Sequence, residues 1–160
     1  MTESHAQNRT GGCSCGALRY RISAAPLIIH GCHCSQCQRQ TGSAFATNML
    51  MMSEDVSFDG AMEEVLMPSP SGAGQRIFRC PTCKVAVSSH YGGAGDLIHF
   101  IRLGTLDDPG DLQPDAHIYT STKRPWVKLP DDRPAFDESY NPAEVWSAVA
   151  LARFREAKGE

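Results

Sequence analysis

Three cysteines within a stretch of six residues constrain this chain more than any other feature. Cys32, Cys34 and Cys37 form a Cys-x-Cys-x-x-Cys cluster. Thiolates held so close repel one another unless a cation neutralises them, and Zn²⁺ takes sulfur ligands at about 2.3 Å in tetrahedral geometry. Three protein ligands leave one position of the tetrahedron open, which is the arrangement that lets a substrate reach a metal. The cluster therefore predicts an open zinc site.

The remaining four cysteines form two shorter motifs. Cys13 and Cys15 lie in a Cys-x-Cys motif, and Cys80 and Cys83 in a Cys-x-x-Cys motif. The simplest partition of seven cysteines is a closed four-cysteine zinc site and a separate open one. Zinc binding at the closed site would be coupled to folding and would stabilise the fold. Spacing alone also allows Cys37 to join Cys80 and Cys83, so the sequence leaves this alternative open.

The composition favours a partner that is a small molecule. Of 160 residues, 41% are hydrophobic and 21% are charged, which is ordinary for one globular domain. The formal net charge of -3 argues against a broad surface that neutralises phosphates. We therefore expect a small-molecule partner and no nucleic acid.

The ends and the cysteine count bear on the compartment. Residues 1–10 are polar and have no apolar core, so they resemble neither a secretory signal nor an anchor. No later run approaches the roughly 18 apolar residues that span a bilayer. We expect a flexible leader over 1–10, one domain over 11–160, no membrane contact and a cytoplasmic location. An odd number of cysteines in reducing cytoplasm indicates metal chemistry before disulfide bonds.

Short apolar runs bounded by Gly, Pro and Ser predict a mainly β structure. Leu18, Tyr20 and Ile22 share one face of such a run. A loop rich in Pro and Ser separates 63–67 from 75–79, so we expect these two segments to form a hairpin. The expected strands cover 17–23, 27–29, 45–52, 63–67, 75–79, 85–90, 97–103 and 117–120, with one helical turn over 36–40.

The C-terminal part of the chain changes to a helical period. Asn141 suits the N-cap and Pro142 the first position of a helix. These signals predict a helix over 142–157. We expect its apolar stripe to pack Trp146 and Val149 against the sheet.

The cysteine motifs together resemble those of the glutathione-dependent formaldehyde-activating family, which includes centromere-protein-V-like members. The resemblance covers about residues 11–137 and implies the all-β, zinc-containing Mss4-like fold with, in this chain, a C-terminal helix. It implies a structural zinc on one cysteine set and a catalytic zinc on the other. The motifs that carry it are Cys13-Ser-Cys15, Cys32-His-Cys34-Ser-Gln-Cys37, Phe78-Arg-Cys80-Pro-Thr-Cys83 and Lys123-Arg-Pro-Trp126, and the implied ligands are Cys13, Cys15, Cys80 and Cys83 for the structural zinc and Cys32, Cys34 and Cys37 for the catalytic one.

One departure from the family pattern concerns the second knuckle. Family members usually carry glycine directly after the second Cys-x-x-Cys motif, where this chain has Lys84. Glycine accepts positive φ angles without strain. We therefore expect this turn to be built differently here.

The resemblance implies a carbon–sulfur lyase-type enzyme that forms or cleaves a thiol–aldehyde adduct. The expected substrates are a small-molecule thiol such as glutathione and an aldehyde, with S-hydroxymethylglutathione as the adduct of formaldehyde. The carboxylates of glutathione require cations near the pocket. The candidates for contacting glutathione are Arg39, Lys123 and Arg124, with Trp126 as a cover for the pocket.

The histidines allow two interpretations. His33 lies between two cysteine ligands, where it can hydrogen-bond to sulfur or shuttle a proton, but we expect it to point outward. The others in the domain are expected to be structural: His30, His90, His99 and His117.

Two other functions remain open from the sequence. A zinc-stabilised binding module without turnover would have the three-cysteine cluster completed by a fourth protein or partner ligand, or free of metal. A redox protein that uses Cys34 or Cys37 ranks last, because the chain lacks a paired active-site context.

Overall fold

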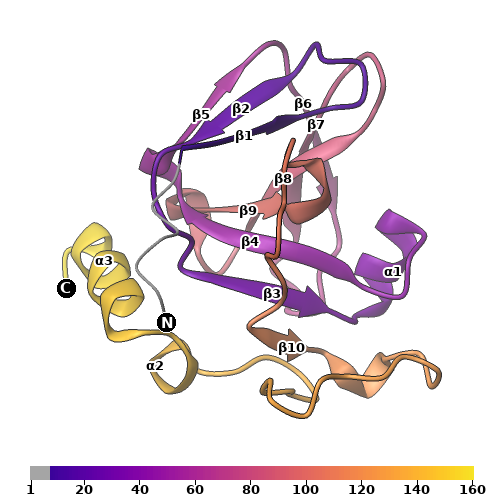
Figure 1. The fold of residues 1–160 in the computed structure, drawn as a ribbon, viewed down its shortest axis with the longest axis vertical. Coiled ribbons are helices and arrows are strands. Elements are labelled where there is room, and N and C mark those ends of the chain that lie inside the picture. Colours follow the sequence, from indigo (N-terminus) through magenta and orange to yellow (C-terminus); the bar gives the residue numbers. More distant parts are fainter. Residues whose placement is uncertain (1–7) are drawn as a thin grey trace.

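The computed structural model describes residues 8–160. Within this range the chain forms ten short strands and three α-helices (Figure 1). The strands are β1 Arg9–Gly12, β2 Arg19–Ile22, β3 Ile28–Cys32, β4 Ala46–Met52, β5 Val56–Asp59, β6 Glu63–Met67, β7 Gln75–Arg79, β8 Ala86–Tyr91, β9 Ile98–Arg102 and β10 Ala116–Ile118. The helices are α1 Ser35–Thr41, α2 Pro142–Val145 and α3 Ala148–Lys158. The expected all-β architecture with C-terminal helical structure is confirmed. In residues 8–160 no helix is both long and apolar enough to cross a bilayer.

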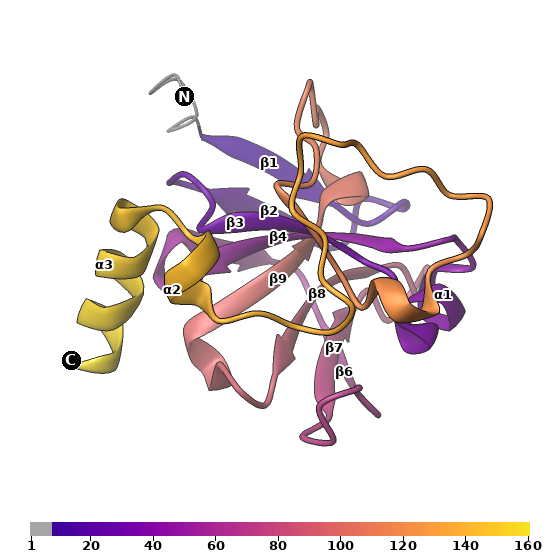
Figure 2. The same cartoon turned by 90° about the horizontal axis from the view of Figure 1, so that it is seen from below.

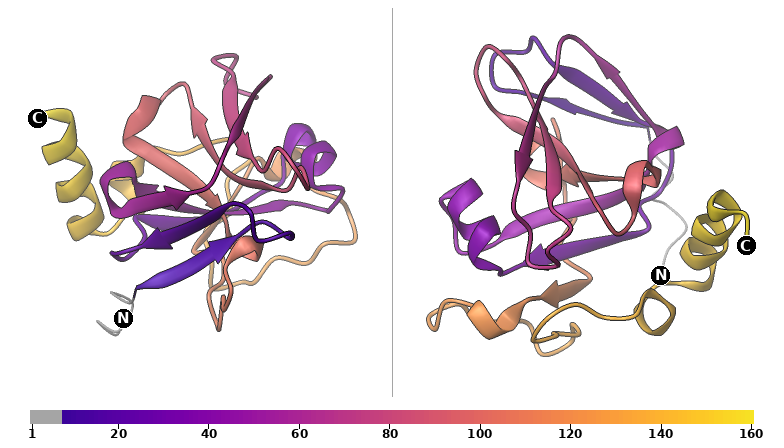
Figure 3. Two further views of the ribbon diagram at one scale, coloured as in Figure 1. Left: turned by 90° about the horizontal axis from the view of Figure 1, so that it is seen from above. Right: turned by 180° about the vertical axis from the view of Figure 1, so that it is seen from behind.

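The strands are arranged in three sheets. A central four-stranded sheet has the order β10-β3-β4-β9, and three-stranded sheets β1-β2-β5 and β6-β7-β8 lie on one side of it (Figures 1 and 3). All pairs within these sheets are antiparallel except β10 with β3, which is parallel. The C-terminal helices lie at the end of this sheet where β3 begins (Figure 2), and the cluster that contains Trp146 and Ala150 includes residues of β3, β4 and β9.

The central sheet is buried on both faces. Met49 and Met51 belong to a core cluster that includes residues of the other two sheets. Leu50 and Met52 belong to a second cluster, which includes α2 and α3. A strand buried on both faces has apolar residues at successive positions, which explains why the methionines obscure the alternation in the sequence.

Two expectations about individual strands are confirmed. Leu18, Tyr20 and Ile22 all face the first core cluster. The segments Glu63–Met67 and Gln75–Arg79 pair as an antiparallel hairpin with the expected bounds. Local sequence signals were sufficient for both, because each depends on near neighbours in the chain.

The leader is shorter than the sequence indicates. Arg9 and Thr10 lie in β1, where they pair with Ile22 and Arg21 of β2. Strand pairing therefore begins before residue 11, and a flexible segment over all of 1–10 is wrong at its C-terminal end. The rest of that expectation, residues 1–7, lies outside the described residues.

The C-terminal helix is interrupted, which corrects the expectation of one helix over 142–157. The backbone of Trp146 is extended, and the Ser147 side chain accepts a hydrogen bond from the N–H of Ala150 as the N-cap of a new helix. The interruption changes which residues face the sheet. Trp146 is buried as expected, but Val149 is 70% exposed and Ala150 is buried in its place.

Candidate metal centres

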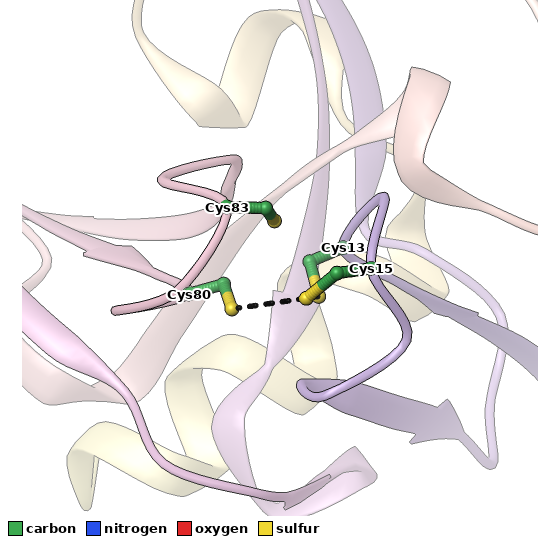
Figure 4. A group of neighbouring side chains, drawn as sticks. All are labelled: Cys13, Cys15, Cys80 and Cys83. Atoms are coloured by element: carbon green, nitrogen blue, oxygen red, sulfur yellow. Dashed lines mark hydrogen bonds between the residues drawn. The ribbon is translucent and has the colours of Figure 1, made fainter.

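The first cysteine group joins two loops from different sheets. Cys13 and Cys15 lie between β1 and β2, whereas Cys80 and Cys83 lie between β7 and β8, and their side chains converge (Figure 4). The Sγ atoms of Cys13 and Cys15 are 3.6 Å apart, and those of Cys15 and Cys80 are 3.7 Å apart. Tetrahedral zinc with bonds of about 2.3 Å requires sulfurs about 3.8 Å apart. The group therefore fits a closed zinc site, and the alternative that placed Cys37 with Cys80 and Cys83 is wrong, because Cys37 lies in the other group.

Local hydrogen bonds prepare this group for a metal. The backbone N–H of Leu18 donates to Sγ of Cys13 at 3.3 Å. This hydrogen bond stabilises the thiolate and lowers the pKa of Cys13 to about 6. A thiol that is already ionised near neutral pH binds zinc without a large cost of deprotonation.

The turn at Lys84 corrects the expectation of a different backbone. Lys84 itself has φ of 65°, and its N–H donates to the carbonyl oxygen of Cys80 at 2.9 Å. The chain therefore builds the turn that glycine would build, with a side chain in the left-handed region. The Lys84 ammonium also donates to Glu63 at 3.1 Å.

The second cysteine group surrounds the start of α1. Cys32 ends β3, Cys34 is the N-cap of α1, and Cys37 lies in its first turns. All three are buried, and their Sγ atoms lie within 4.8 Å of one another. Among residues 8–160, no fourth His, Cys, Asp or Glu donor joins the group. The set provides three soft donors at one corner of the central sheet, which fits an open zinc site.

Hydrogen bonds within this group favour ionisation of one thiol in particular. Interactions with Cys32 and Cys37 lower the pKa of Cys34 to about 3, while the pKa of Cys32 is raised by the same contacts. The backbone N–H of Cys37 also donates to Sγ of Cys34 at 3.3 Å. Within the group, Cys34 is therefore the thiol whose ionisation the surroundings favour most.

A buried cation lies near this cluster, and sequence reasoning did not identify it. Arg102 is 8% exposed and donates hydrogen bonds to Asn48 and Gln40. Among the described residues it has no carboxylate within ion-pairing distance. A hydrogen bond with Cys32 lowers the pKa of Cys37, but Cys34 and burial raise it to about 11, and the charge of Arg102 opposes this rise as a smaller effect. Strand pairing brings Arg102 to this position, because it lies opposite Asn48, which in turn lies opposite His30. Such a cross-strand row can be recognised only once the register of the strands is known.

His33 is fully buried, which corrects the expectation that it points outward. Its Nε2 lies 3.0 Å from Nδ1 of His117, which belongs to β10. Its carbonyl oxygen accepts hydrogen bonds from Gln38 and Thr122. A Cβ on Gly31 would lie 2.6 Å from the His117 ring, so only glycine allows β10 to approach β3 this closely. The pair of histidines holds the cysteine segment against β10.

A cavity of about 550 Å³ adjoins the three-cysteine group. Cys32 and Cys34 form part of its lining, together with residues of the central sheet, β8 and the segment 139–160. Its aromatic lining residues are Tyr91, Phe100, Tyr119, Tyr140, Trp146 and Phe154. A pocket of this size is typical of a small-molecule site.

The residues expected to contact glutathione surround a different, open hollow. Arg39, Arg124 and Trp126 line it together with Ser35 and Lys128, but none of the three clustered cysteines does. Within residues 8–160, no carboxylate pairs with any of its three cations. The hollow is thus electropositive on a chain of net negative charge.

Lys123 and Trp126 differ from their expected roles. The ammonium of Lys123 donates to the carbonyl oxygens of Arg124 and Val127, so it holds the loop together and does not line the hollow. Trp126 is 70% exposed, and it lines the open hollow and not the cavity beside the cysteines.

Comparisons with known proteins agree with the cysteine pattern. A family model described as glutathione-dependent formaldehyde-activating enzyme matches residues 8–122. A protein of Halomonas elongata named "Putative glutathione-dependent formaldehyde-activating enzyme" is 25% identical over 125 residues, covering 74% of this chain and 79% of the relative. The crystal structure of a Rhodobacter sphaeroides protein aligns with a TM-score of 0.48 and 19% identity, covering 66% of this chain and 91% of that one.

Proposed function

This chain belongs to the glutathione-dependent formaldehyde-activating family, and on that basis we propose that it is a zinc-dependent enzyme of the carbon–sulfur lyase type. It forms or cleaves a thiol–aldehyde adduct, with glutathione and formaldehyde giving S-hydroxymethylglutathione. The observation that carries the proposal is the three-cysteine group, which offers three buried ligands and lies on the wall of a cavity. A binding module completed by a fourth ligand from residues 8–160 is disfavoured, since none joins the group.

The residues divide the work between two metal centres. Cys13, Cys15, Cys80 and Cys83 hold a structural zinc, and Cys32, Cys34 and Cys37 hold a catalytic one. Zinc at the open site would keep a bound thiol in its thiolate form at neutral pH and polarise a carbonyl oxygen. The reaction is an addition: a bond forms between sulfur and the aldehyde carbon, and the proton of the thiol ends on the oxygen. No oxidant or reductant is required.

Arg102 contributes charge to this site. A substrate thiolate beside three cysteine thiolates increases the negative charge in a region of low dielectric constant. The guanidinium of Arg102, buried and without a carboxylate partner among the described residues, offsets this charge. Its hydrogen bonds to Asn48 and Gln40 fix its position.

We propose that the charged peptide portion of glutathione lies over the electropositive hollow. Arg39 and Arg124 would meet its carboxylates. The hollow and the cavity adjoin the same segment, since Ser35 lines the hollow and the preceding Cys34 lines the cavity. With its peptide portion in the hollow, glutathione would place its sulfur near this segment and the cysteine group.

The test compares the zinc-loaded protein with its Cys34→Ser variant. Serine is a preferred N-cap residue, so the variant keeps the cap of α1 while it loses one ligand. Exchange spectroscopy by NMR on mixtures of glutathione and formaldehyde measures the rate of adduct formation. We expect the wild type to accelerate exchange and the variant to approach the uncatalysed rate, with unchanged circular dichroism. Equal rates for the two proteins would refute the assignment.

A further inference from the structure

The cavity extends far from the cysteine group. Cys32, at the end of β3, lines one part of it, and Leu50, which pairs with Ile28 at the start of β3, lines another. The four steps of strand from Ile28 to Cys32 span about 13 Å at about 3.3 Å per residue. Figure 1 shows α1 and α3 near opposite ends of β3, and residues beside both helices line the same cavity. Formaldehyde brings a single carbon and would leave most of this length empty.

Much of the distant part of the cavity is apolar. Leu50, Ile98 and Phe100 line it from the central sheet. Leu151 and Phe154 line it from α3, and the charged residues Arg155, Lys158 and Glu160 line it as well. The apolar part of this wall stabilises alkyl or aryl groups, which leave water there.

Three polar side chains of the cavity lining form a short chain of hydrogen bonds, although Nδ1 of His30 has no partner among the described residues. The indole N–H of Trp146 donates to the hydroxyl oxygen of Tyr140 at 2.9 Å, and this hydroxyl group is also hydrogen-bonded to Nε2 of His30. Since Nε1 of Trp146 is satisfied within the protein, the indole presents its apolar ring. The ring of Trp146 lies 5.5 Å from that of Phe154, so the wall is continuous.

We propose that this cavity receives a bulky apolar group bonded to the carbon that joins glutathione sulfur. The substrates would be adducts of glutathione with apolar aldehydes that carry an alkyl chain or an aromatic ring. The inference rests on the proposed function and specifies its substrate class. The bonds that form and break are those of the formaldehyde reaction, with a larger substituent on the aldehyde carbon.

The end of the chain supplies this selectivity. The family model ends at residue 122, whereas the wall formed by Tyr140, Trp146, Leu151 and Phe154 lies beyond it. The metal ligands all lie inside the matched range. The residues that would bind the catalytic zinc therefore lie in the matched segment. The residues that would select the aldehyde lie in the segment after it.

Calorimetry with stable thioethers tests the inference without turnover. The zinc-loaded protein is titrated with S-methylglutathione and with S-hexylglutathione, which share the peptide and differ in the apolar group. Burial of the longer chain should make S-hexylglutathione bind at least about tenfold more tightly. Equal affinities, or no binding of either compound, would overturn the inference.

A cavity-filling substitution locates the apolar group. Ala143 is exposed and lines the rim of the cavity at the start of α2, so Ala143→Phe should reduce the preference for S-hexylglutathione at least about fivefold. Ala152→Phe places the same ring on an exposed position of α3 outside the cavity and should keep the preference. Melting temperatures identify any loss of folding. A preference retained in a folded Ala143→Phe protein would place the chain elsewhere and contradict the proposal.

The outcomes separate this inference from the proposed function. Catalysed exchange with formaldehyde and no preference for the hexyl thioether would leave the enzyme assignment in place and remove the apolar site. A clear preference for the hexyl thioether without catalysed exchange of any aldehyde would leave the apolar site in place and remove the enzyme assignment.

Discussion

One buried cation lies near the three-cysteine group. Arg102 is hydrogen-bonded to Asn48 and Gln40, and no carboxylate among the described residues pairs with it. Cysteine clusters are visible in a sequence because their ligands are close together. Arg102 lies 65 positions after Cys37 in the chain, so its role depends on strand register.

Replacing Arg102 should weaken zinc binding at the open site. Arg102→Met removes the positive charge while it keeps much of the side-chain volume. Loss of an outer partner of a metal site lowers affinity about 10- to 100-fold, and we expect an effect of that order, measured by competition with a chelator for the more weakly bound zinc.

Two further variants control this prediction. Arg102→Lys keeps the charge and should recover much of the affinity. Arg21→Met removes an exposed arginine of β2 and should change neither zinc. Zinc binding by Arg102→Met that equals the wild type would show that the charge has no role.

Single residues also show why the knuckle turn could not be predicted. With lysine at position 84, the turn was expected to differ from the one that glycine builds. The structure has φ of 65° at Lys84, a conformation that costs a residue with a side chain about 1–2 kcal/mol. The convergence of four cysteines determines this turn, and local propensity does not.

At the scale of elements, neighbouring strands bury titratable groups. His90 of β8 and His99 of β9 have ring centroids 4.0 Å apart, and Ser88 is hydrogen-bonded to Nδ1 of His99 at 2.8 Å. The groups around them include Phe58 and Phe78, with Arg76 and Glu64 as the nearby charges. Burial lowers the pKa of His99 to about 4 and lowers that of His90 as well.

These histidines should make folding stability fall in acid. The unfolded chain takes up protons below a pKa of about 6.5, whereas the folded chain keeps His99 neutral down to about 4. Stability is therefore complete above about pH 6.5 and is lost as the pH falls towards 4, with a slope of at most about 1.4 kcal/mol per pH unit for each proton. Urea denaturation at pH 7, 6 and 5 measures this slope. His99→Gln should reduce the slope of the unfolding free energy with pH. Any loss of zinc in acid affects both proteins, so the difference between their slopes reports on His99 alone. Parallel curves would contradict the prediction.

The elements also show how far the sequence could be interpreted. The hairpin β6–β7 followed from a loop rich in turn residues, and β2 from its alternation. The break between α2 and α3 was missed, because Ser147 is an ordinary helix residue until its side chain caps Ala150. Likewise, β4 appears as a continuous apolar run because both of its faces are buried.

At the scale of the whole molecule, the four-cysteine group links two sheets. One pair of ligands follows β1 and the other follows β7, so a zinc ion there closes a loop of more than sixty residues. Cross-links that close long loops restrict the unfolded chain most. The three-cysteine group lies in one short segment and restricts little of the chain.

The two groups should therefore respond differently to loss of a ligand. Cys80→Ser should lower the melting temperature by about 8–16 °C, which corresponds to roughly 4 kcal/mol for a chain of this size. Cys37→Ser should retain a cooperative transition within a few degrees of the wild type while it binds one zinc fewer. Thermal denaturation followed by circular dichroism, with elemental analysis of the purified proteins, measures both. A similar loss of stability in the two variants would refute this division.

At this scale the four-plus-three grouping of the cysteines is confirmed, whereas the pocket could not be located from the sequence. The three-cysteine group was visible because its motif is local, but spacing alone left the partners of Cys80 and Cys83 open. The cavity was not accessible, because its lining comes from five strands and the C-terminal segment. Arg39 and Arg124 were assigned to the rim of the cysteine site, and they lie around a neighbouring hollow.

The contact between His33 and His117 has a consequence for the order of assembly. These side chains are 84 positions apart, and they join β3 to β10 in the one parallel pair of the described sheets. Closing so long a loop is slow compared with forming a local turn. During synthesis, the segment of Cys32, Cys34 and Cys37 emerges and can bind metal well before β10 exists. The three cysteines thus emerge first and the C-terminal wall of the cavity last. Under the proposed function, a nascent chain would hold zinc before it could distinguish one aldehyde from another.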